Sequence, residues 1–339
     1  MEPILKIENL KTSFMTSGGE VQAVRGVSFS VGKGEILGIV GESGSGKSVT
    51  SMSILRLLAD TARIKDGSIL FEGEDLTKLS KKQIRKIRGE KIAMIFQDPM
   101  SSLNPLIPVG KQVSEMIREH HPDKSREELK KEVMELFSRV RIPEPEKRYH
   151  SFPHEFSGGM RQRVMIAMAL ANKPELLIAD EPTTALDVTI QDQILRQLRE
   201  LEKEYGTSII FITHDLGVVA ELCDRVIVMY GSLVMEEAPI EDIFEHPSHP
   251  YTMGLLASIP DIEQNKEVRL SPIPGSPPDM TNPPKGCPFA PRCPYARSVC
   301  AVELPEFSAV GEGHYSRCFL LSPDAPADEN NPFKLRSKP

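Results

Sequence analysis

The chain lacks both an excess of positive charge and an apolar stretch long enough to cross a bilayer. Its 339 residues include 41 Lys and Arg against 48 Asp and Glu, which gives a formal net charge of −7. A basic surplus is usual where nucleic acid is the main partner, so this balance argues against that class. Apolar runs such as residues 208–212 have the length of a buried strand, whereas a spanning helix needs about 20 apolar residues. If the protein acts at a membrane, we expect an integral partner to hold it there.

We also expect neither a secretory leader nor a disulfide framework. The first residues contain no charged segment followed by an apolar one, so we expect no signal peptide. The thiols would then meet a reducing cytosol, where disulfides are rare. The sequence has only five cysteines, and four of them lie between Cys287 and Cys318. Their grouping requires an explanation other than disulfide bonding.

Short apolar runs alternate with helical patterns along most of the chain. The first strands are expected near residues 4–10, 24–31 and 68–73, with Gly-rich breaks between them. Further runs are expected to form strands at residues 35–40, 91–96, 176–179, 208–213 and 225–230. Helical patterns, including one at residues 47–58, separate these runs. This alternation is typical of an α/β protein with a mostly parallel sheet.

Two segments depart from that alternation. Between Pro99 and Ala171 the pattern is helical, with an apolar face from Leu129 to Val140 and a second helix at residues 160–170. Proline appears nine times between residues 271 and 294, which excludes a helix or a central strand there. We therefore predict three parts, with a helical subdomain inserted in the first. They are a domain at residues 1–260 (helical subdomain about 99–172), a Cys/Pro-rich extension at 261–321 and a disordered tail at 322–339.

A phosphate-binding pattern follows the apolar run at residues 35–40. The segment matches G-x-x-x-x-G-K-[ST] and precedes a helical pattern. Glycines let backbone N–H groups point at phosphate oxygens, and the helix N-terminus adds positive potential. Lys47 would neutralise the β- and γ-phosphates, and the Ser48 hydroxyl would bind Mg²⁺. The predicted ATP-binding residues of this loop are Gly41, Glu42, Ser43, Gly44, Ser45, Gly46, Lys47 and Ser48.

An apolar run at residues 176–179 ends in two carboxylates, Asp180 and Glu181. Asp180, at the carboxyl end of the strand, is placed to support Mg²⁺. Glu181 would project toward the γ-phosphate and polarise the attacking water as a general base. An acidic pair alone would more commonly cap a strand. The phosphate-binding loop upstream favours the catalytic interpretation.

With these two motifs, the chain resembles the ATP-binding-cassette (ABC) ATPases over nearly all of residues 4–246. The segment from Phe156 to Arg163 is similar to the family's signature loop, whose Ser157, Gly158 and Gly159 present a hydroxyl and bare N–H groups to a phosphate. The family usually has glutamine at the position of Met160 and leucine at that of Phe156. The resemblance implies an ABC-type P-loop NTPase fold, with a mostly parallel core sheet, an antiparallel β subdomain and an inserted helical subdomain.

The resemblance also assigns roles to four isolated residues. Gln97 matches the glutamine that touches Mg²⁺ and links the core to the helical subdomain, and it is predicted to be catalytic together with His214 and Glu181. His214 matches the switch histidine that contacts the γ-phosphate, and Asp187 matches a loop at the dimer interface. Phe14 lies where the family has an aromatic that stacks on adenine, although it could equally be a core strand residue. The implied magnesium ligands are Ser48, Gln97 and Asp180.

In this family the signature loop closes on the nucleotide of a facing cassette, so two ATP molecules lie between two cassettes. Segments 96–105, 156–163 and 249–252 are similar to the peptide and nickel importer subgroup. The resemblance implies that this chain powers import of dipeptides or oligopeptides from the cytoplasmic face of the membrane. The implied partners are a second cassette, identical or different, two membrane-spanning permease subunits and an extracytoplasmic substrate-binding protein, without nucleic acid.

The remaining cysteines form the set Cys287, Cys293, Cys300 and Cys318, separated by wider gaps than the close pairs of usual zinc sites. Four thiolates with such spacing are compatible with an iron–sulfur cluster. Similar importers carry a [4Fe–4S] cluster in extensions of this kind, so we predict that cofactor, with Zn²⁺ as the alternative. His314 could replace one ligand.

Three other interpretations stay open. A nickel or other small-solute importer would share nearly every motif. A soluble ABC ATPase unconnected with transport is a more distant possibility, but this chain is acidic and lacks long coiled coils and a second cassette. A binding module with an inactive loop conflicts with intact Lys47, Asp180, Glu181 and His214.

Overall fold

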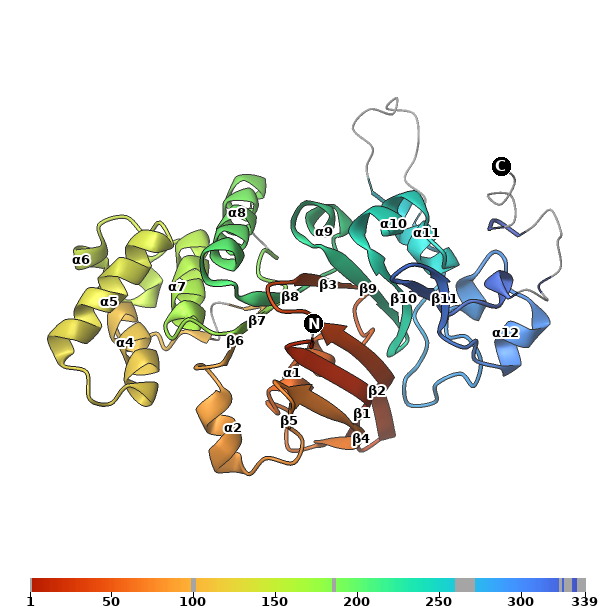
Figure 1. Cartoon of the computed structure of the whole chain (residues 1–339), viewed down its shortest axis with the longest axis horizontal. Coiled ribbons are helices and arrows are strands. Elements are labelled where there is room, and N and C mark those ends of the chain that lie inside the picture. The colour runs from red at the N-terminus through yellow and green to blue at the C-terminus, as the bar shows by residue number, and fades with distance from the viewer. Residues whose placement is uncertain are drawn as a thin grey trace. The chain divides into compact units, whose positions relative to one another are not determined.

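The computed structural model describes residues 2–98, 102–184, 187–259, 272–322, 325 and 331–333 (Figure 1). Contacts divide the chain into two compact units, each built from several segments. Unit 1 comprises Met1–Leu5, Ser30–Ile36 and Leu70–Ile212. Unit 2 comprises Lys6–Phe29, Leu37–Ile69 and Thr213–Pro339.

Unit 1 contains a parallel set of three short strands. They are β6 (Ile92–Ile95), β7 (Leu176–Asp180) and β8 (Ser208–Thr213), with β7 between the other two. All five residues of β7 and all six of β8 are buried, which explains why the sequence shows continuous apolar runs without alternation. The last two residues of β4 (Ala62–Phe71) also pair with β5 (Glu74–Asp75).

Local hydrogen bonds and backbone conformation explain where two helices of unit 1 begin or end. In α5, Ser125 and Glu128 form a capping box, each side chain accepting a hydrogen bond from the other residue's backbone N–H. Helix α8 (Val188–Tyr205) is capped by Asp187 at its N-terminus and is followed by Gly206, whose φ of 65° suits glycine. The unit's α-helices are α2 (Lys81–Ile87), α4 (Val109–His120), α5 (Arg126–Arg139), α6 (Pro145–Arg148), α7 (Gly158–Leu170) and α8 (Val188–Tyr205), with the 3₁₀ turn η1 at Pro153–Glu155.

Unit 2 contains antiparallel strands from the N-terminal part of the chain and a mixed sheet. In the first group, β1 (Leu5–Thr16) lies between β2 (Gly19–Val31) and β4. In the mixed sheet, β3 (Ile36–Val40) is parallel to β9 (Arg225–Tyr230), which is antiparallel to β10 (Leu233–Pro239). The helices are α1 (Lys47–Ile54), α9 (Leu216–Leu222), α10 (Ile240–Glu245), α11 (Pro250–Leu256) and α12 (Ser298–Val302), with 3₁₀ turns η2 (Ala290–Arg292) and η3 (Phe319–Leu321).

The Cys/Pro-rich extension adds two strands to this mixed sheet. Strand β12 (His314–Ser316) pairs antiparallel with β10, with Ser316 opposite Glu236, and β11 (Ser308–Gly311) pairs with β12. We expected this part of the chain to be irregular. The sequence did not predict these strands because they are short. All four residues of β11 are exposed, so the strand shows no alternation of apolar and polar residues.

The α/β architecture with an antiparallel group and inserted helices is confirmed. Helices α4 to α7 fall within the predicted helical subdomain, and the apolar face of α5 is buried at Leu129, Val133 and Phe137. Helix α1 is shorter than predicted and ends at Ile54, because Arg56 adopts a left-handed conformation with φ of 52°. The predicted boundary near residue 260 and most of the predicted tail lie outside the described residues.

Within the part of the chain that the structure describes, every helix is too short or too polar to traverse a lipid bilayer.

Candidate functional site

The loop between β3 and α1 requires glycine at two of its positions. Gly41 has a φ of 153°, and a Cβ atom there would lie 2.1 Å from the carbonyl oxygen of Met229. Gly46 has a φ of 98°, and its Cβ would lie 2.5 Å from the carbonyl oxygen of Ala23. No side chain could be accommodated at either position without a shift of the backbone. The glycines of the phosphate-binding pattern are therefore explained by local geometry.

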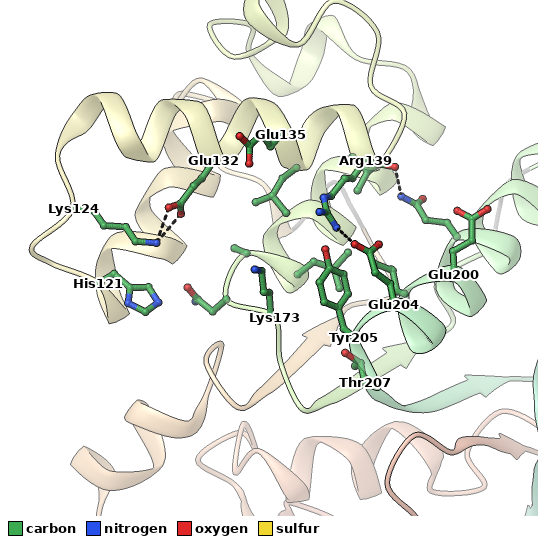
Figure 2. A pocket seen from close by; sticks show the side chains of 17 residues that line it. His121, Lys124, Glu132, Glu135, Arg139, Lys173, Glu200, Glu204, Tyr205 and Thr207 are labelled. Carbon is green, nitrogen blue, oxygen red and sulfur yellow. Dashed lines mark hydrogen bonds and ion pairs between the residues drawn. The ribbon is translucent and has the colours of Figure 1, made fainter.

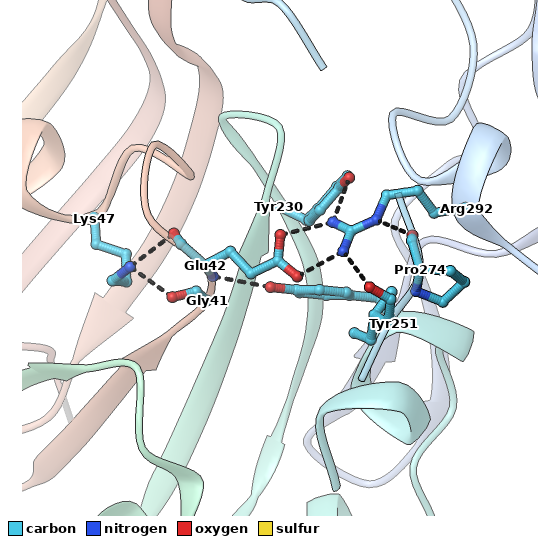
Figure 3. Close-up of polar contacts among 8 residues, drawn as sticks. Gly41, Glu42, Lys47, Tyr230, Tyr251, Pro274 and Arg292 are labelled. Atoms are coloured by element: carbon cyan, nitrogen blue, oxygen red, sulfur yellow. Dashed lines mark hydrogen bonds and ion pairs between the residues drawn. The ribbon is translucent and has the colours of Figure 1, made fainter. Parts of the chain in front are cut away.

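Lys47, the first residue of α1, points back over the loop that precedes it. Its side chain is buried, and its Nζ donates to the carbonyl oxygens of Gly41 at 2.6 Å and Glu42 at 3.0 Å (Figure 3). Ser48 follows as the second residue of α1. The N-terminus of α1 and the Lys47 ammonium group place positive potential at one end of this loop, which is suited to binding an anion.

The loop also has two partners that we did not foresee. The hydroxyl of Tyr251 accepts a hydrogen bond from the backbone N–H of Glu42 at 2.9 Å. The guanidinium of Arg292 forms an ion pair with the Glu42 carboxylate at 2.6 Å (Figure 3). Both residues come from parts of the sequence with no phosphate-binding pattern. The only available signals were that Tyr251 lies in a segment similar to one importer subgroup and that Arg292 precedes Cys293.

The acidic pair in unit 1 lies at the end of β7. Asp180 is buried, whereas Glu181 is partly exposed and has a φ of 47°, a conformation that non-glycine residues rarely adopt. One oxygen of the Glu181 carboxylate, Oε2, accepts hydrogen bonds from Gln97 Nε2 and Thr184 Oγ1, both at 2.9 Å. Strained backbone held by several contacts is often found at functional positions. Gln97 and Glu181, both among the residues predicted to be catalytic, are in direct contact.

The signature-like segment begins α7 with its polar groups exposed. Ser157 caps the helix, its Oγ accepting from the N–H of Met160 at 3.4 Å. A Cβ atom on Gly158 would meet nothing within 4 Å, so the backbone there is open to a ligand. Phe156 is buried, with the Arg148 guanidinium 5.6 Å from its ring centroid. Its aromatic ring therefore fills an apolar position and does not alter the exposed Ser-Gly-Gly group.

The other predicted residues lie after a strand, at the start of a helix or on a strand. His214 is exposed immediately after β8, and Asp187 caps α8 by accepting from the N–H of Ile190 at 2.9 Å. Phe14 is half-buried on β1. Glu181, Gln97, Asp187 and the signature segment belong to unit 1, whereas the phosphate-binding loop, Phe14 and His214 belong to unit 2.

Unit 1 also has a cavity of about 500 Å³ beside α5 and α8 (Figure 2). Its charged groups are largely neutralised by one another, since Lys124 pairs with Glu132 at 2.8 Å and Arg139 with Glu204 at 2.7 Å. The predicted site residues are not among those that line it. Size alone therefore does not make this cavity the nucleotide site.

The four clustered cysteines, Cys287, Cys293, Cys300 and Cys318, line one cavity of about 20 Å³ in unit 2, and all are free thiols. Burial, with a smaller contribution from neighbouring cysteines of the set, raises the pKa of Cys287 and of Cys293 to about 11. Burial likewise raises the pKa of Cys318. Four thiolates could not coexist here without a cation to offset their repulsion.

The structure nevertheless gives no direct support for a bound metal. Among the described residues, no three side chains of His, Cys, Asp or Glu are arranged as metal ligands. His314, considered as a substitute ligand, instead places its Nε2 2.8 Å from the buried carboxylate of Glu236. The cysteine site thus stays a prediction, and His314 is not among the residues that line the cavity.

His249 makes the stability of unit 2 depend on pH. Burial lowers its pKa to about 3, and its Nδ1 accepts from the N–H of Tyr251 at 3.0 Å, which requires a neutral ring. In the unfolded chain the ring would bind a proton below about pH 6.5. The unfolded state therefore binds more protons, and stability is lost as pH falls from about 6.5 toward 3.

We expect the free energy of unfolding to fall by about 2 kcal/mol more between pH 7 and pH 5 in the natural chain than in a His249→Asn variant. Asparagine can still cap α11 but does not titrate. Denaturant unfolding at both pH values measures this difference. Equal pH dependence in the two proteins would show that His249 is not buried in its neutral form.

Comparisons with known proteins agree with the geometry. Residues 24–184 match the ABC transporter family, and residues 235–300 match the oligopeptide/dipeptide transporter C-terminal region. The oligopeptide transport ATP-binding protein OppD of Bacillus subtilis is 57% identical, covering 96% of this chain and 91% of that protein. The dipeptide transport ATP-binding protein DppD of the same organism is 53% identical, covering 94% and 95%.

Solved structures of similar fold include the dimeric structure of a bacterial ABC transporter cassette. It has a TM-score of 0.64 and 29% identity, and the match covers 70% of this chain and 98% of that one. A dimeric post-hydrolysis state of an ATP-binding cassette with ADP and Pi matches with the same values. The phosphate-binding loop, the acidic pair and the relatives that span nearly the whole chain lead to one conclusion: this protein belongs to the ABC transporter ATP-binding proteins that carry the oligopeptide/dipeptide C-terminal region.

Proposed function

We propose that this chain binds and hydrolyses ATP to power the import of dipeptides or oligopeptides through a membrane permease. The observation that carries the proposal is the 57% and 53% identity, over 96% and 94% of the chain, to two peptide transport ATP-binding proteins. The chain is an ATPase, and its transported solute would contact other subunits. The nickel importer is the neighbouring alternative.

In this proposal the loop from Gly41 to Ser48 holds the phosphates of ATP. Its backbone N–H groups and the N-terminus of α1 would surround the phosphate oxygens, and Lys47 would exchange its carbonyl partners for the β- and γ-phosphates. Phe14 would stack on the adenine. The conformations of Gly41 and Gly46 support this role, because they require glycine where the pattern has it.

Hydrolysis would depend on the carboxylates at the end of β7. Asp180, Ser48 and Gln97 would hold Mg²⁺, which neutralises charge on the phosphates during transfer. Glu181 would accept a proton from the attacking water, while His214 would contact the γ-phosphate and keep Glu181 in place. The hydrogen bonds from Gln97 and Thr184 support this assignment, because they fix the orientation of the carboxylate that would act as the base.

Each nucleotide-binding site would be completed by a second cassette, identical to this chain or different from it. Ser157, Gly158 and Gly159 would bind the γ-phosphate of the partner's ATP, and Asp187 would lie at the interface. The exposed hydroxyl of Ser157 and the open backbone at Gly158 support a ligand that comes from outside this chain. Release of the γ-phosphate would then open the pair and drive the permease between its two orientations.

The remaining partners follow from the same proposal. Two membrane-spanning permease subunits would hold the cassettes at the cytoplasmic face of the membrane, where ATP is supplied, and an extracytoplasmic binding protein would deliver the solute. The decisive experiment reconstitutes the whole assembly in vesicles and measures ATP-dependent uptake of defined peptides and of Ni²⁺. We expect peptides to accumulate. Uptake of Ni²⁺ without peptide would establish the alternative, and the absence of any coupled uptake would refute transport.

We further infer that Cys287, Cys293, Cys300 and Cys318 hold an iron–sulfur cluster of the [4Fe–4S] type, with Zn²⁺ as the alternative. The observation in favour is that four thiols from separate segments of the chain line one cavity. A cavity of about 20 Å³ has room for little more than a water molecule, so a cluster requires the thiols to turn outward, whereas a single ion does not. The bound group would have a structural role and pin the extension.

Anaerobically purified protein is therefore expected to be brown, with broad visible absorbance that is lost in a Cys293→Ser variant. A matched control is Cys223→Ser, because Cys223 is a buried thiol that does not line the cavity. Iron and zinc analysis completes the measurement. One zinc per chain without iron would replace the cluster by the alternative, and the absence of both metals would reject the site.

A further inference from the structure

Arg292, in the predicted C-terminal extension, bonds directly to the phosphate-binding loop. Arg292 and Glu42 are 250 residues apart in the sequence and form two parallel hydrogen bonds, Nη1 to Oε2 at 2.6 Å and Nη2 to Oε1 at 3.0 Å (Figure 3). We propose that Arg292 and Tyr251 are positioning residues that hold the phosphate-binding loop in its ATP-binding form, so that the extension sets the ATP affinity of its own chain. This goes beyond the proposed function and does not depend on which solute is transported.

The hydrogen-bonding capacity of Arg292 is completely used. Besides Glu42, its guanidinium donates to the Tyr230 hydroxyl at 3.1 Å and to the carbonyl oxygens of Pro274 at 2.8 Å and Ile273 at 3.1 Å. A guanidinium has five N–H donors, and these contacts account for all five. The side chain is only 6% exposed. Removing a buried and fully bonded cation leaves its carboxylate partner without compensation, which is far more costly than losing a surface ion pair.

Tyr251 fixes the backbone of the same loop residue. Its hydroxyl accepts from the N–H of Glu42, and burial raises the pKa of that hydroxyl, so it stays neutral. The ring is fully buried, with centroids 4.6 Å from Tyr230 and 5.3 Å from Phe289. Phe289 comes from the extension, only three residues before Arg292. Tyr251 therefore holds the backbone of Glu42, and Arg292 holds its side chain.

The position of Glu42 matters for phosphate binding because Lys47 donates to its carbonyl oxygen. The N–H groups that would face the phosphates follow Glu42 directly along the loop. A loop that is ordered before ATP arrives loses less conformational entropy on binding than one that must be ordered by it. The hydrogen bonds and the ion pair that hold Glu42 therefore favour tighter ATP binding.

Arg292 is also adjacent to the cysteine cavity. It ends the turn η2, and Cys293, the next residue, lines the cavity. Anything that rearranges this turn changes the position of the guanidinium. A rearrangement of the cysteine site that moved η2 would therefore also move the guanidinium that is bonded to the phosphate-binding loop.

The test compares ATP affinity in full-length variants, measured with a fluorescent ATP analogue and without permease or solute. We expect Arg292→Gln to weaken binding about tenfold, a factor equivalent to about 1.4 kcal/mol. Arg292→Lys should recover only part of this loss, because an ammonium cannot form the two parallel bonds. Tyr251→Phe should weaken binding less, since it removes one hydrogen bond. In the assembled transporter the Arg292→Gln defect should appear in KM more than in kcat.

Arg317 provides a matched control. It too precedes a cysteine, is largely buried and has its guanidinium over an aromatic ring, that of Phe307. Its side chain bonds to the carbonyl oxygens of Val234 and Pro305, which are not part of the loop. Arg317→Gln should therefore leave ATP affinity unchanged, with circular dichroism used to establish that each variant is folded.

A double-mutant cycle separates a direct tie from general damage. If Arg292 acts through Glu42, Arg292→Gln and Glu42→Gln together should weaken ATP binding less than the product of their separate effects. Wild-type affinity in folded Arg292→Gln, equal losses in Arg317→Gln, or independent effects in the cycle would overturn the proposal. Because only ATP binding is measured, these outcomes do not depend on the peptide transport assignment.

Discussion

Replacement of Glu181 by glutamine is expected to slow ATP turnover by about 10²- to 10⁴-fold while leaving ATP binding intact, since that is the range that a general base contributes. Glutamine has the same length and still offers an oxygen to Gln97 and Thr184, so the local arrangement should survive. It cannot accept a proton from water at neutral pH. Steady-state turnover in the assembled transporter and binding of a fluorescent ATP analogue measure the two properties separately.

Glu175→Gln is the control for this substitution. Glu175 lies directly before the opposite end of β7, and Lys91 lies 3.5 Å from its carboxylate. Its loss should leave turnover near that of the natural protein. Unchanged turnover in Glu181→Gln would mean that the catalytic base is elsewhere.

Replacement of Ser157 by aspartate is expected to reduce turnover by about 10²-fold or more, because a negative charge would face the phosphate of the partner's ATP. Aspartate is as good a helix cap as serine, so α7 should be preserved. ATP binding to the chain's own loop should not change. Turnover and nucleotide binding in the assembled transporter test this separation.

Ser157→Asn serves as the matched variant, since asparagine also caps a helix but carries no charge. It should keep much more activity than Ser157→Asp. Equal and full activity in both variants would contradict a role for the signature segment at a second nucleotide. Equal loss in both would indicate that the hydroxyl itself, rather than charge, is what matters.

The nucleotide-binding motifs could be predicted because their geometry is local. Gly41 and Gly46 have φ values of 153° and 98°, which favour glycine, and a buried strand followed by a helix fixes where Lys47 begins α1. The helix at residues 160–170 was likewise predicted within two residues of its observed start at Gly158. The backbone conformations and helix starts are local properties, although the carbonyl oxygens that exclude a Cβ atom at Gly41 and Gly46 belong to the distant residues Met229 and Ala23.

Features that depend on distant residues could not be predicted in this way. The ion pair between Arg292 and Glu42 joins residues with no shared periodicity, and β12 pairs with β10 through only a few residues. The four cysteines that are close in the sequence line one cavity, but the burial that raises the pKa values of Cys287 and Cys293 could not be predicted. Burial depends on how separated segments pack, which composition and pattern leave open.

ATP turnover by the strictly monomeric chain, followed by addition of the second cassette of its transporter, tests most directly whether this protein supplies only half of each nucleotide pocket. Sedimentation would establish the association state in each sample. We expect the monomer to bind ATP with little hydrolysis, and turnover to rise with the fraction of paired cassettes. Vigorous hydrolysis by a preparation that stays monomeric would contradict the shared site.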